Sequence, residues 1–364
     1  MGAASGLIKG LGVTLLFTAA GCPLARAGAA IDIQLVTTLP RNEPYEGQLF
    51  HDGVLWETHS LQADGEQHRV DVYDAQGQTK IGSVPLTHTA SYIYPYSAHQ
   101  VLVVGKSATP YWQTHFTIIT RSGTSFSTRV TDFPEEYMID QSGGDASALF
   151  FNEPGSRGVF RWTSARGLQK IGDDVSGPGA MQSDGRNLWV IERHGPALGD
   201  EGLVRIDPVT GSTERTFGNA VRNGLTDLQA TSHFPWVAVS EALAEQVLFV
   251  DKTTDTLAYT VAVPGTPRGL TQLGGCLLVA SEDSKQVTFI ALWGDTPHVI
   301  DQWDVSAAGD QLKKPRSIAV NPETGRVFLR STYLCPTCAT TQSSVYSAAQ
   351  TDGVTVRKCL ANAR

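Results

Sequence analysis

Four short strand-like segments, separated by turns, recur in the same order in the second half of the chain. In one copy they span residues 267–270, 275–280, 286–290 and 299–303. The next copy places them at 315–320, 325–329, 344–347 and 354–357. Self-similarity at a period of roughly 40 to 50 residues is typical of proteins in which four-stranded sheets are arranged around a common axis.

Fainter copies come earlier in the chain. The same order of strands starts at Gly179 and again at Asn223, and weaker copies begin near Tyr137, Tyr92 and Tyr45. No segment after residue 30 shows the apolar spacing of an amphipathic helix, whereas short runs rich in Val, Ile, Phe and Trp recur between turns. We therefore predict an all-β fold, a seven-bladed β-propeller of four-stranded antiparallel blades, with residues 31–360 forming a single domain.

The strands of a blade are named a to d in chain order, with a innermost. Because consecutive strands are antiparallel, the b–c and d–a loops share one face of the ring, called the upper face here, and the a–b and c–d loops share the lower face. Residues 31–37 form a further strand, which we expect to pair with the last blade, because ring closure removes an exposed sheet edge. Trp56, Trp189 and Trp236 fall in b strands and are expected to face the core between blades.

The repeat resembles a known family. Its pattern, Pro-x-Gly-Leu, then Gly-x-Leu-Leu-Val-Ala, then x-Val-x-Val-Ile-Asp-x-x-Thr-Gly, is similar to that of YVTN-type and related periplasmic propellers. The resemblance covers residues 176–360 well and 40–175 weakly. It implies the architecture and no particular activity, since propellers with one fold carry many functions.

The N-terminus has the form of an export signal. Lys9 precedes an apolar stretch at 11–20, and Ala25-Arg26-Ala27 has the small-x-small pattern of a cleavage site, so residues 1–27 are predicted to be a signal peptide. The apolar stretch is too short to span a bilayer. A second processing site is possible at Cys22, where Ala19-Ala20-Gly21-Cys22 resembles a lipoprotein box. We expect a periplasmic or secreted protein that meets the membrane only if Cys22 is lipidated.

Charge and motifs exclude several functions. The formal charge is −8 and no run of Lys or Arg is present, so the chain lacks the basic patch that drives nucleic-acid binding. The nucleophile elbow, the dinucleotide fingerprint, the phosphate-binding Gly-Lys loop and His-Glu-x-x-His are also missing. The nine histidines are scattered. We therefore expect no cofactor and no metal site.

Four cysteines follow the predicted signal. Export would place them where disulfides persist. Cys335 and Cys338 fall in the predicted b–c loop of the last blade and Cys359 at the end of its predicted d strand, all on the upper face, whereas Cys276 starts a b strand near the lower face. We therefore expect a bridge among Cys335, Cys338 and Cys359, with Cys276 buried and reduced.

Charged residues recur where strands meet the upper face. The acidic ones end or follow b strands, and the arginines precede or open a strands; they are Glu57, Glu192, Glu241 and Glu282, and Arg222, Arg268 and Arg316. Two readings stay open for Arg268 and Arg316. Either they pair internally with Glu241 and Glu282, or they hold an anionic ligand at the channel mouth, with Glu57 and Glu192 as the opposing acids.

The first blade carries a second resemblance. Tyr45-Glu46-Gly47-Gln48-Leu49, followed by Asp52-Gly53-Val54-Leu55-Trp56-Glu57-Thr58, is similar to the opening of the glutamine cyclotransferases, although His59-Ser60 replaces the end of their motif. This resemblance implies that Glu57 is a catalytic acid. Glu57 with Asn223 could instead imitate the metal ligands of gluconolactonase-like propellers.

These observations predict a binding scaffold that recognises an unknown protein or a small anionic ligand through its upper face. The alternative is a propeller enzyme of the cyclotransferase or lactonase type that uses Glu57. The sequence leaves open whether the protein is catalytic.

Overall fold

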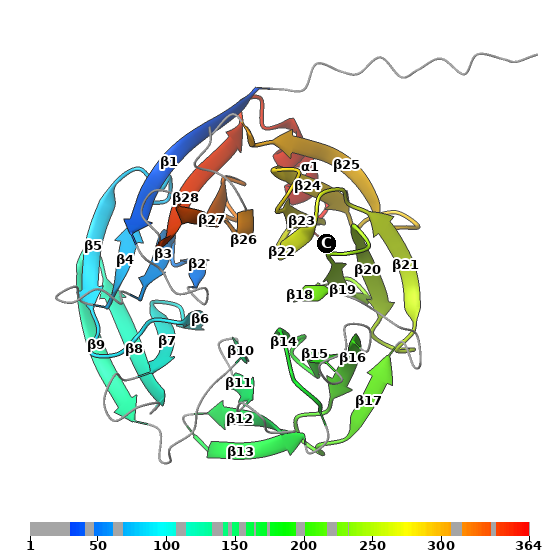
Figure 1. Ribbon diagram of the computed structural model, residues 1–364, viewed down its shortest axis with the longest axis horizontal. Coiled ribbons are helices and arrows are strands. Elements are labelled where there is room, and N and C mark those ends of the chain that lie inside the picture. Colours follow the sequence, from blue (N-terminus) through cyan, green and yellow to red (C-terminus); the bar gives the residue numbers. More distant parts are fainter. Residues whose placement is uncertain are drawn as a thin grey trace, which may run out of the picture.

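The fold is a closed ring of seven four-stranded antiparallel sheets, which confirms the predicted β-propeller (Figure 1). The computed structural model describes residues 30–40, 47–60, 68–106, 114–132, 141–144, 148–152, 158–163, 165–172, 175–193, 201–216, 224–231, 233–306, 315–335 and 340–363. The predicted signal peptide, Arg222, Asn223 and Cys338 lie outside these ranges.

Each of the first six blades is built from four consecutive strands, listed here from the channel outward. Blade 1 contains β2 Gln48–His51, β3 Val54–His59, β4 Arg69–Tyr73 and β5 Lys80–Pro85. Blade 2 contains β6 Tyr92–Ser97, β7 Gln100–Lys106, β8 Thr114–Ser122 and β9 Ser125–Asp132. Blade 3 contains β10 Gln141–Gly144, β11 Leu149–Asn152, β12 Val159–Thr163 and β13 Gly167–Gly172. Blade 4 contains β14 Met181–Ser183, β15 Leu188–Arg193, β16 Glu201–Ile206 and β17 Thr213–Thr216. Blade 5 contains β18 Leu225–Ala230, β19 Trp236–Glu241, β20 Gln246–Asp251 and β21 Leu257–Ala262. Blade 6 contains β22 Pro267–Leu273, β23 Cys276–Ser281, β24 Gln286–Ala291 and β25 His298–Asp304.

Burial explains why b and d strands differ in sequence. Every residue of β19 and of β23 is buried, because a b strand is covered on both faces by neighbouring blades, and the sequence is accordingly an apolar run. The outer strand β21 is mostly exposed. Trp56, Trp189 and Trp236 are buried in apolar clusters that join adjacent blades, as predicted.

The seventh blade closes the ring with both ends of the domain. Its strands are β26 Pro315–Val320, β27 Val327–Cys335, β28 Thr340–Gln350 and, outermost, β1 Ile31–Pro40. β1 pairs with β28 from Ile31 opposite Gln350 to Pro40 opposite Gln342. The prediction that the N-terminal strand pairs with the last blade is therefore confirmed.

The prediction of a strand at residues 354–357 is wrong. This segment belongs to a helix, α1 Val354–Ala361, because β1 already occupies the outer position and leaves no sheet edge for the tail. The Asp352 carboxylate accepts a hydrogen bond from the Val354 amide at 3.0 Å at the start of the helix. Val356 and Cys359 point into the core of blades 6 and 7. Within the described ranges, no helix has the length and hydropathy needed to cross a membrane.

The cysteine prediction is also corrected. Cys276 is bonded to Cys359, with 5.2 Å between their Cα atoms, and both side chains are fully buried. Cys276 does begin its b strand at the lower face, but Cys359 lies there too, because the tail remains at the end where β28 finishes. Gly275 donates a backbone hydrogen bond to the Cys359 carbonyl at 2.8 Å. Cys335 lies at the end of β27, and its side chain is outside the described part of the structure.

Candidate binding site at the channel and its upper mouth

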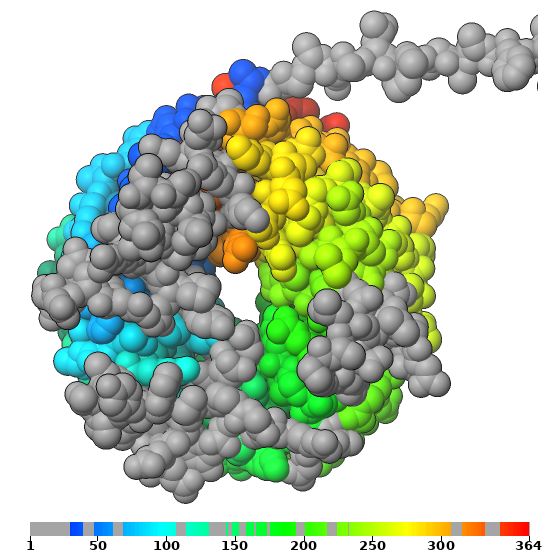
Figure 2. Space-filling model, viewed as in Figure 1, coloured from blue at the N-terminus to red at the C-terminus, as the bar shows by residue number. Residues whose placement is uncertain are grey.

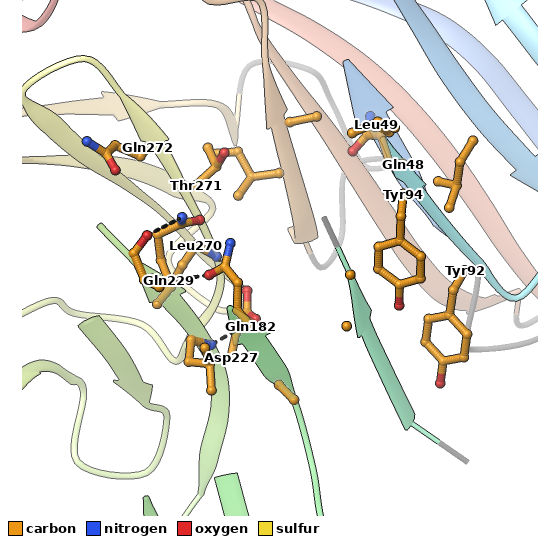
Figure 3. Close-up of a pocket in the computed structure, with 18 of the residues that line it drawn as sticks. Gln48, Leu49, Tyr92, Tyr94, Gln182, Asp227, Gln229, Leu270, Thr271 and Gln272 are labelled. Atoms are coloured by element: carbon orange, nitrogen blue, oxygen red, sulfur yellow. Dashed lines mark hydrogen bonds between the residues drawn. The ribbon is translucent and has the colours of Figure 1, made fainter. Parts of the chain in front are cut away.

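The seven inner strands enclose a central channel with a volume of about 740 Å³. The opening remains visible at the centre of the space-filling view (Figure 2). Most of the polar side chains on its wall come from blades 4 to 6: Gln182, Thr226, Asp227, Gln229, Thr271 and Gln272 (Figure 3). None of the predicted site residues that the structure describes is among the residues lining this channel. The sequence analysis therefore missed the channel wall as a candidate site.

Two of these side chains tie neighbouring blades together. The inner strand of each blade is a sheet edge, with amide groups that need acceptors. The Gln182 carbonyl oxygen of blade 4 accepts a hydrogen bond from the Ala230 amide of blade 5 at 2.7 Å. The Asp227 carboxylate of blade 5 accepts one from the Leu270 amide of blade 6 at 2.8 Å (Figure 3). The polar wall is therefore partly structural.

Asp227 is the one Asp, Glu, Lys or Arg among the described residues that line the channel. Burial raises the pKa of its carboxyl to about 6, although hydrogen bonds from the Leu270 and Leu228 amides act in the opposite direction. Its second oxygen accepts the Leu228 amide at 2.9 Å. Both carboxylate oxygens are thus already engaged by the backbone.

The opposite wall is aromatic. Tyr92 and Tyr94 of β6 have near-parallel rings, 13° apart with centroids at 6.4 Å. They lie beside the short inner strand of blade 3, which ends in Gly143 and Gly144. A Cβ atom on Gly144 would come within 3.2 Å of the Tyr94 ring, and one on Gly143 would clash with a backbone carbonyl at 1.9 Å. Glycine is therefore required at position 143, and at position 144 it allows the Tyr94 ring to lie close to the backbone.

At the upper mouth, Arg268 and Arg316 share one carboxylate. The Glu282 oxygens accept hydrogen bonds from Arg268 Nε at 2.8 Å and from Arg316 Nη2 at 3.2 Å. Glu282 is 4% exposed, whereas Arg268 is 37% and Arg316 47% exposed. Internal pairing with Glu282, one of the two readings, is thus present, and the cluster of two guanidinium groups and one carboxylate retains a net positive charge.

The other predicted acids are held elsewhere. Glu241 accepts a hydrogen bond from Gln246 Nε2 at 2.5 Å and is not paired with Arg268 or Arg316 in any contact described. Glu192 is buried and accepts Arg215 Nε at 3.0 Å and the Ser176 amide at 2.8 Å. Among the described residues, Arg268 and Arg316 therefore pair with Glu282 and not with these two acids.

Glu57 is buried between blades 1 and 7 and has no exposed surface. Its carboxylate lies 3.5 Å from Nη1 of Arg330, which belongs to β27 of blade 7. The Arg330 guanidinium also donates to the backbone carbonyls of Gly47 and Thr58 at 3.3 and 3.4 Å. Sequence reasoning missed Arg330, and the available signal was an arginine inside the apolar b strand Val-Phe-Leu-Arg.

Burial shifts both members of this pair. Desolvation raises the pKa of the Glu57 carboxyl well above its usual range, and the nearby Asp71 raises it further, while Gln48 acts in the opposite direction. Burial lowers the pKa of Arg330 to about 9. Both shifts reflect the cost of holding a charge away from water, and the mutual attraction and the hydrogen bonds of Arg330 to the backbone carbonyls offset part of that cost.

A second buried ionic group lies next to Glu57 in blade 1. Asp71, the cross-strand neighbour of Glu57, is 3.3 Å from the His59 ring and 2.7 Å from Lys80. Burial lowers the pKa of His59 to about 4, so this ring is neutral at pH 7. Among the described residues, no group of three or more His, Cys, Asp or Glu side chains is arranged to hold a metal ion.

Comparison with known proteins supports the fold. No family matches the sequence, and no curated protein matches it. A solved structure of streptogramin B lyase is similar over 88% of this chain and 97% of its own, with a TM-score of 0.60 and 13% identity. Virginiamycin B lyase from Staphylococcus aureus is similar over 88% of this chain and 99% of its own, with a TM-score of 0.59 and 13% identity. A chain of the mitotic checkpoint complex is similar over 93% of this chain and 98% of its own, with a TM-score of 0.58 and 10% identity. At these identities the likeness concerns the β-propeller fold, and neither the YVTN nor the glutamine cyclotransferase resemblance is confirmed.

Proposed function

We propose that this protein is an exported binding propeller that recognises an acidic group of a partner protein or a small anion at the upper mouth of its channel. Arg268 and Arg316 are the anchoring residues. They lie on the innermost strands of adjacent blades, so that one ligand can contact both.

One observation carries this proposal: two half-exposed guanidinium groups share a single buried carboxylate. Each guanidinium has five N–H donors in a planar fork, and one carboxylate occupies few of them. The remaining donors favour a carboxylate or phosphate that is bound bidentately. Glu282 holds both side chains in place, which lowers the entropic cost of binding.

The position of Glu57 does not favour the enzyme alternative. A general acid must come within hydrogen-bond reach of its substrate. The Glu57 carboxylate has no exposed surface and is paired with Arg330, so blades 1 and 7 would have to separate before a substrate reached it.

The binding proposal is tested with the double variant Arg268→Ala/Arg316→Ala. Citrate and a Glu-rich octapeptide serve as probes in isothermal titration calorimetry at low and at physiological salt. We expect the wild type to bind at least one probe, with affinity that falls as salt screens the charges, and the double variant to lose at least tenfold.

A matched control removes the same charge from the lower face. Arg186 lies in the turn between β14 and β15 and Arg357 in α1, and both are exposed. Arg186→Ala/Arg357→Ala should bind the probes like the wild type. An equal loss of probe affinity in both double variants would show a general effect of charge. If Arg268→Ala/Arg316→Ala loses stability but binds the probes as the wild type does, the two arginines have a structural role only.

Export is the second part of the proposal. The Cys276–Cys359 disulfide supports it, because such bonds persist in oxidising compartments. Expression of the full chain in a bacterium, followed by fractionation and mass spectrometry, tests the processing. A mature N-terminus at Gly28 is expected after signal cleavage, whereas a lipid on Cys22 would establish the lipoprotein alternative, and an unprocessed cytoplasmic chain would contradict export.

A further inference from the structure

The channel wall offers hydrogen-bonding groups that no described residue uses. In blade 4, the Gln182 carbonyl oxygen is engaged by the Ala230 amide, but no contact occupies its amide nitrogen. In blade 5, the Gln229 side chain makes one long contact, from Nε2 to the Ala230 carbonyl at 3.3 Å, and leaves its oxygen unused. In blade 6, the Thr271 hydroxyl has no partner among the described residues. Three adjacent blades thus present both donors and acceptors to the same cavity.

The described lining of the channel contains almost no charged group that a ligand could pair with. Arg268 and Arg316 are not among the lining residues. Asp227 is the one carboxylic acid in the described lining, and its two oxygens accept hydrogen bonds from the Leu270 and Leu228 amides. An anionic ligand would find no counter-charge among the described lining residues, and a cationic one would find a carboxylate already engaged by backbone donors.

The other side of the channel offers phenol rings. Tyr92 and Tyr94 stand across from the Gln and Thr side chains (Figure 3), and Gly143 and Gly144 line the same cavity. An aromatic wall facing uncharged polar groups suits a ligand that has apolar C–H faces and many hydroxyls. The volume of about 740 Å³ lies within the usual range of small-molecule sites, roughly 300 to 1,000 Å³.

We propose that the channel binds a small, uncharged, polyhydroxylated ligand of the mono- or disaccharide class, through Gln182, Gln229 and Thr271 on one side and Tyr92 and Tyr94 on the other. This site shares no residue with the anion site at the upper mouth, so the two proposals stand or fall separately.

Saturation-transfer NMR and calorimetry with glucose, N-acetylglucosamine, maltose and chitobiose test the site. The variant Gln229→Leu/Thr271→Val replaces two polar groups by apolar groups of similar size. We expect at least one saccharide to bind the wild type, and the variant to bind it about tenfold more weakly, as the loss of two hydrogen bonds implies.

The control variant Thr260→Val/Gln302→Leu makes the same changes on the exposed outer strands of the same two blades. It should bind like the wild type, and so should Arg268→Ala/Arg316→Ala, which separates this site from the upper mouth. Thermal unfolding verifies that each variant is folded. The proposal is overturned if no saccharide binds, if Gln229→Leu/Thr271→Val binds as tightly as the wild type, or if spermidine or citrate competes for the same site.

Discussion

Two blade junctions in this ring both lie between four-stranded sheets but differ in chemistry. Between blades 5 and 6 the facing strands bury an apolar cluster that includes Trp236, Phe249 and Ile290. Between blades 7 and 1 the apolar cluster is smaller, with Leu55 and Phe328 among its members, and a buried ion pair lies beside it.

The difference shows what the fold requires of a junction. Apolar packing works at any junction because it needs no particular partner. A buried charge needs one specific neighbour, and here the neighbours are far apart in the chain, Glu57 near its start and Arg330 near its end. We expect the pair to fix blade 1 against blade 7 when the ring closes rather than to add much net stability.

The largest effect is expected from breaking the pair on one side. Glu57→Leu leaves the Arg330 guanidinium charged and buried and should lower the free energy of unfolding by about 3 to 5 kcal/mol. Arg330→Met should cost less, because the carboxyl left behind can become neutral by binding a proton, whereas a guanidinium with a pKa of about 9 is still charged at pH 7. Urea unfolding of both variants measures the two losses.

The double variant Glu57→Leu/Arg330→Met is the control for this prediction. Replacing both charges by apolar groups should restore the free energy of unfolding to within about 1 to 2 kcal/mol of the wild type. Additive losses in the double variant would contradict the view that the pair acts as one unit.

The junction between blades 6 and 7 is held covalently, and removing this bond should have the next largest effect. Cys276→Ser/Cys359→Ser opens a link between residues 83 positions apart and frees α1 from the lower end of β23. We expect a loss of about 2 to 4 kcal/mol in urea unfolding. The wild type treated with a reductant should match the variant; a reductant-insensitive wild type would indicate that the bond does not form.

The polar tie on the channel side of the blade 5–6 junction should respond to pH. The pKa of Asp227 in the folded protein is about 6, above its usual value, so the native state binds more protons than the unfolded chain between about pH 4 and 6. Stability due to this group is therefore present below about pH 4 and decreases by on the order of 3 kcal/mol as the pH rises through about 6. Urea unfolding at pH 4, 5, 6 and 7 measures the profile.

Asp227→Asn removes the titration while retaining the shape. Its free energy of unfolding should lack this decrease between pH 4 and 6, and subtracting the two profiles cancels the other titrating groups. Parallel profiles for the variant and the wild type would show that Asp227 has an ordinary pKa.

The smallest effect is expected from the apolar packing of the same junction. Ile290→Val removes one methylene from a fully buried side chain and should cost about 1 kcal/mol, with no dependence on pH or salt. Urea unfolding with and without 0.5 M NaCl, compared with the wild type, measures it. A salt-dependent loss would mean that Ile290 contributes through more than apolar packing.

The blades themselves could be predicted from local sequence. Segments such as 276–281 are apolar runs bounded by turns, and a b strand covered on both faces can tolerate little else. The repeat therefore predicted the blade count, most strand positions, the buried tryptophans and the closing N-terminal strand. The upper-face positions of Arg268, Arg316 and Glu282 followed from strand direction.

Contacts between distant segments were decided only by the tertiary structure. Residues 354–357 have a strand-like pattern, yet they form part of α1, because β1 takes the outer place in blade 7 and a sheet edge can be paired only once. Because β1 takes this place, Cys359 lies at the lower face, where it is bonded to Cys276. Likewise the partner of Glu57 is Arg330, 273 positions away, and the channel wall combines side chains from several blades. A local pattern specifies which residues form a strand, but which strands and side chains meet depends on the closure of the whole ring.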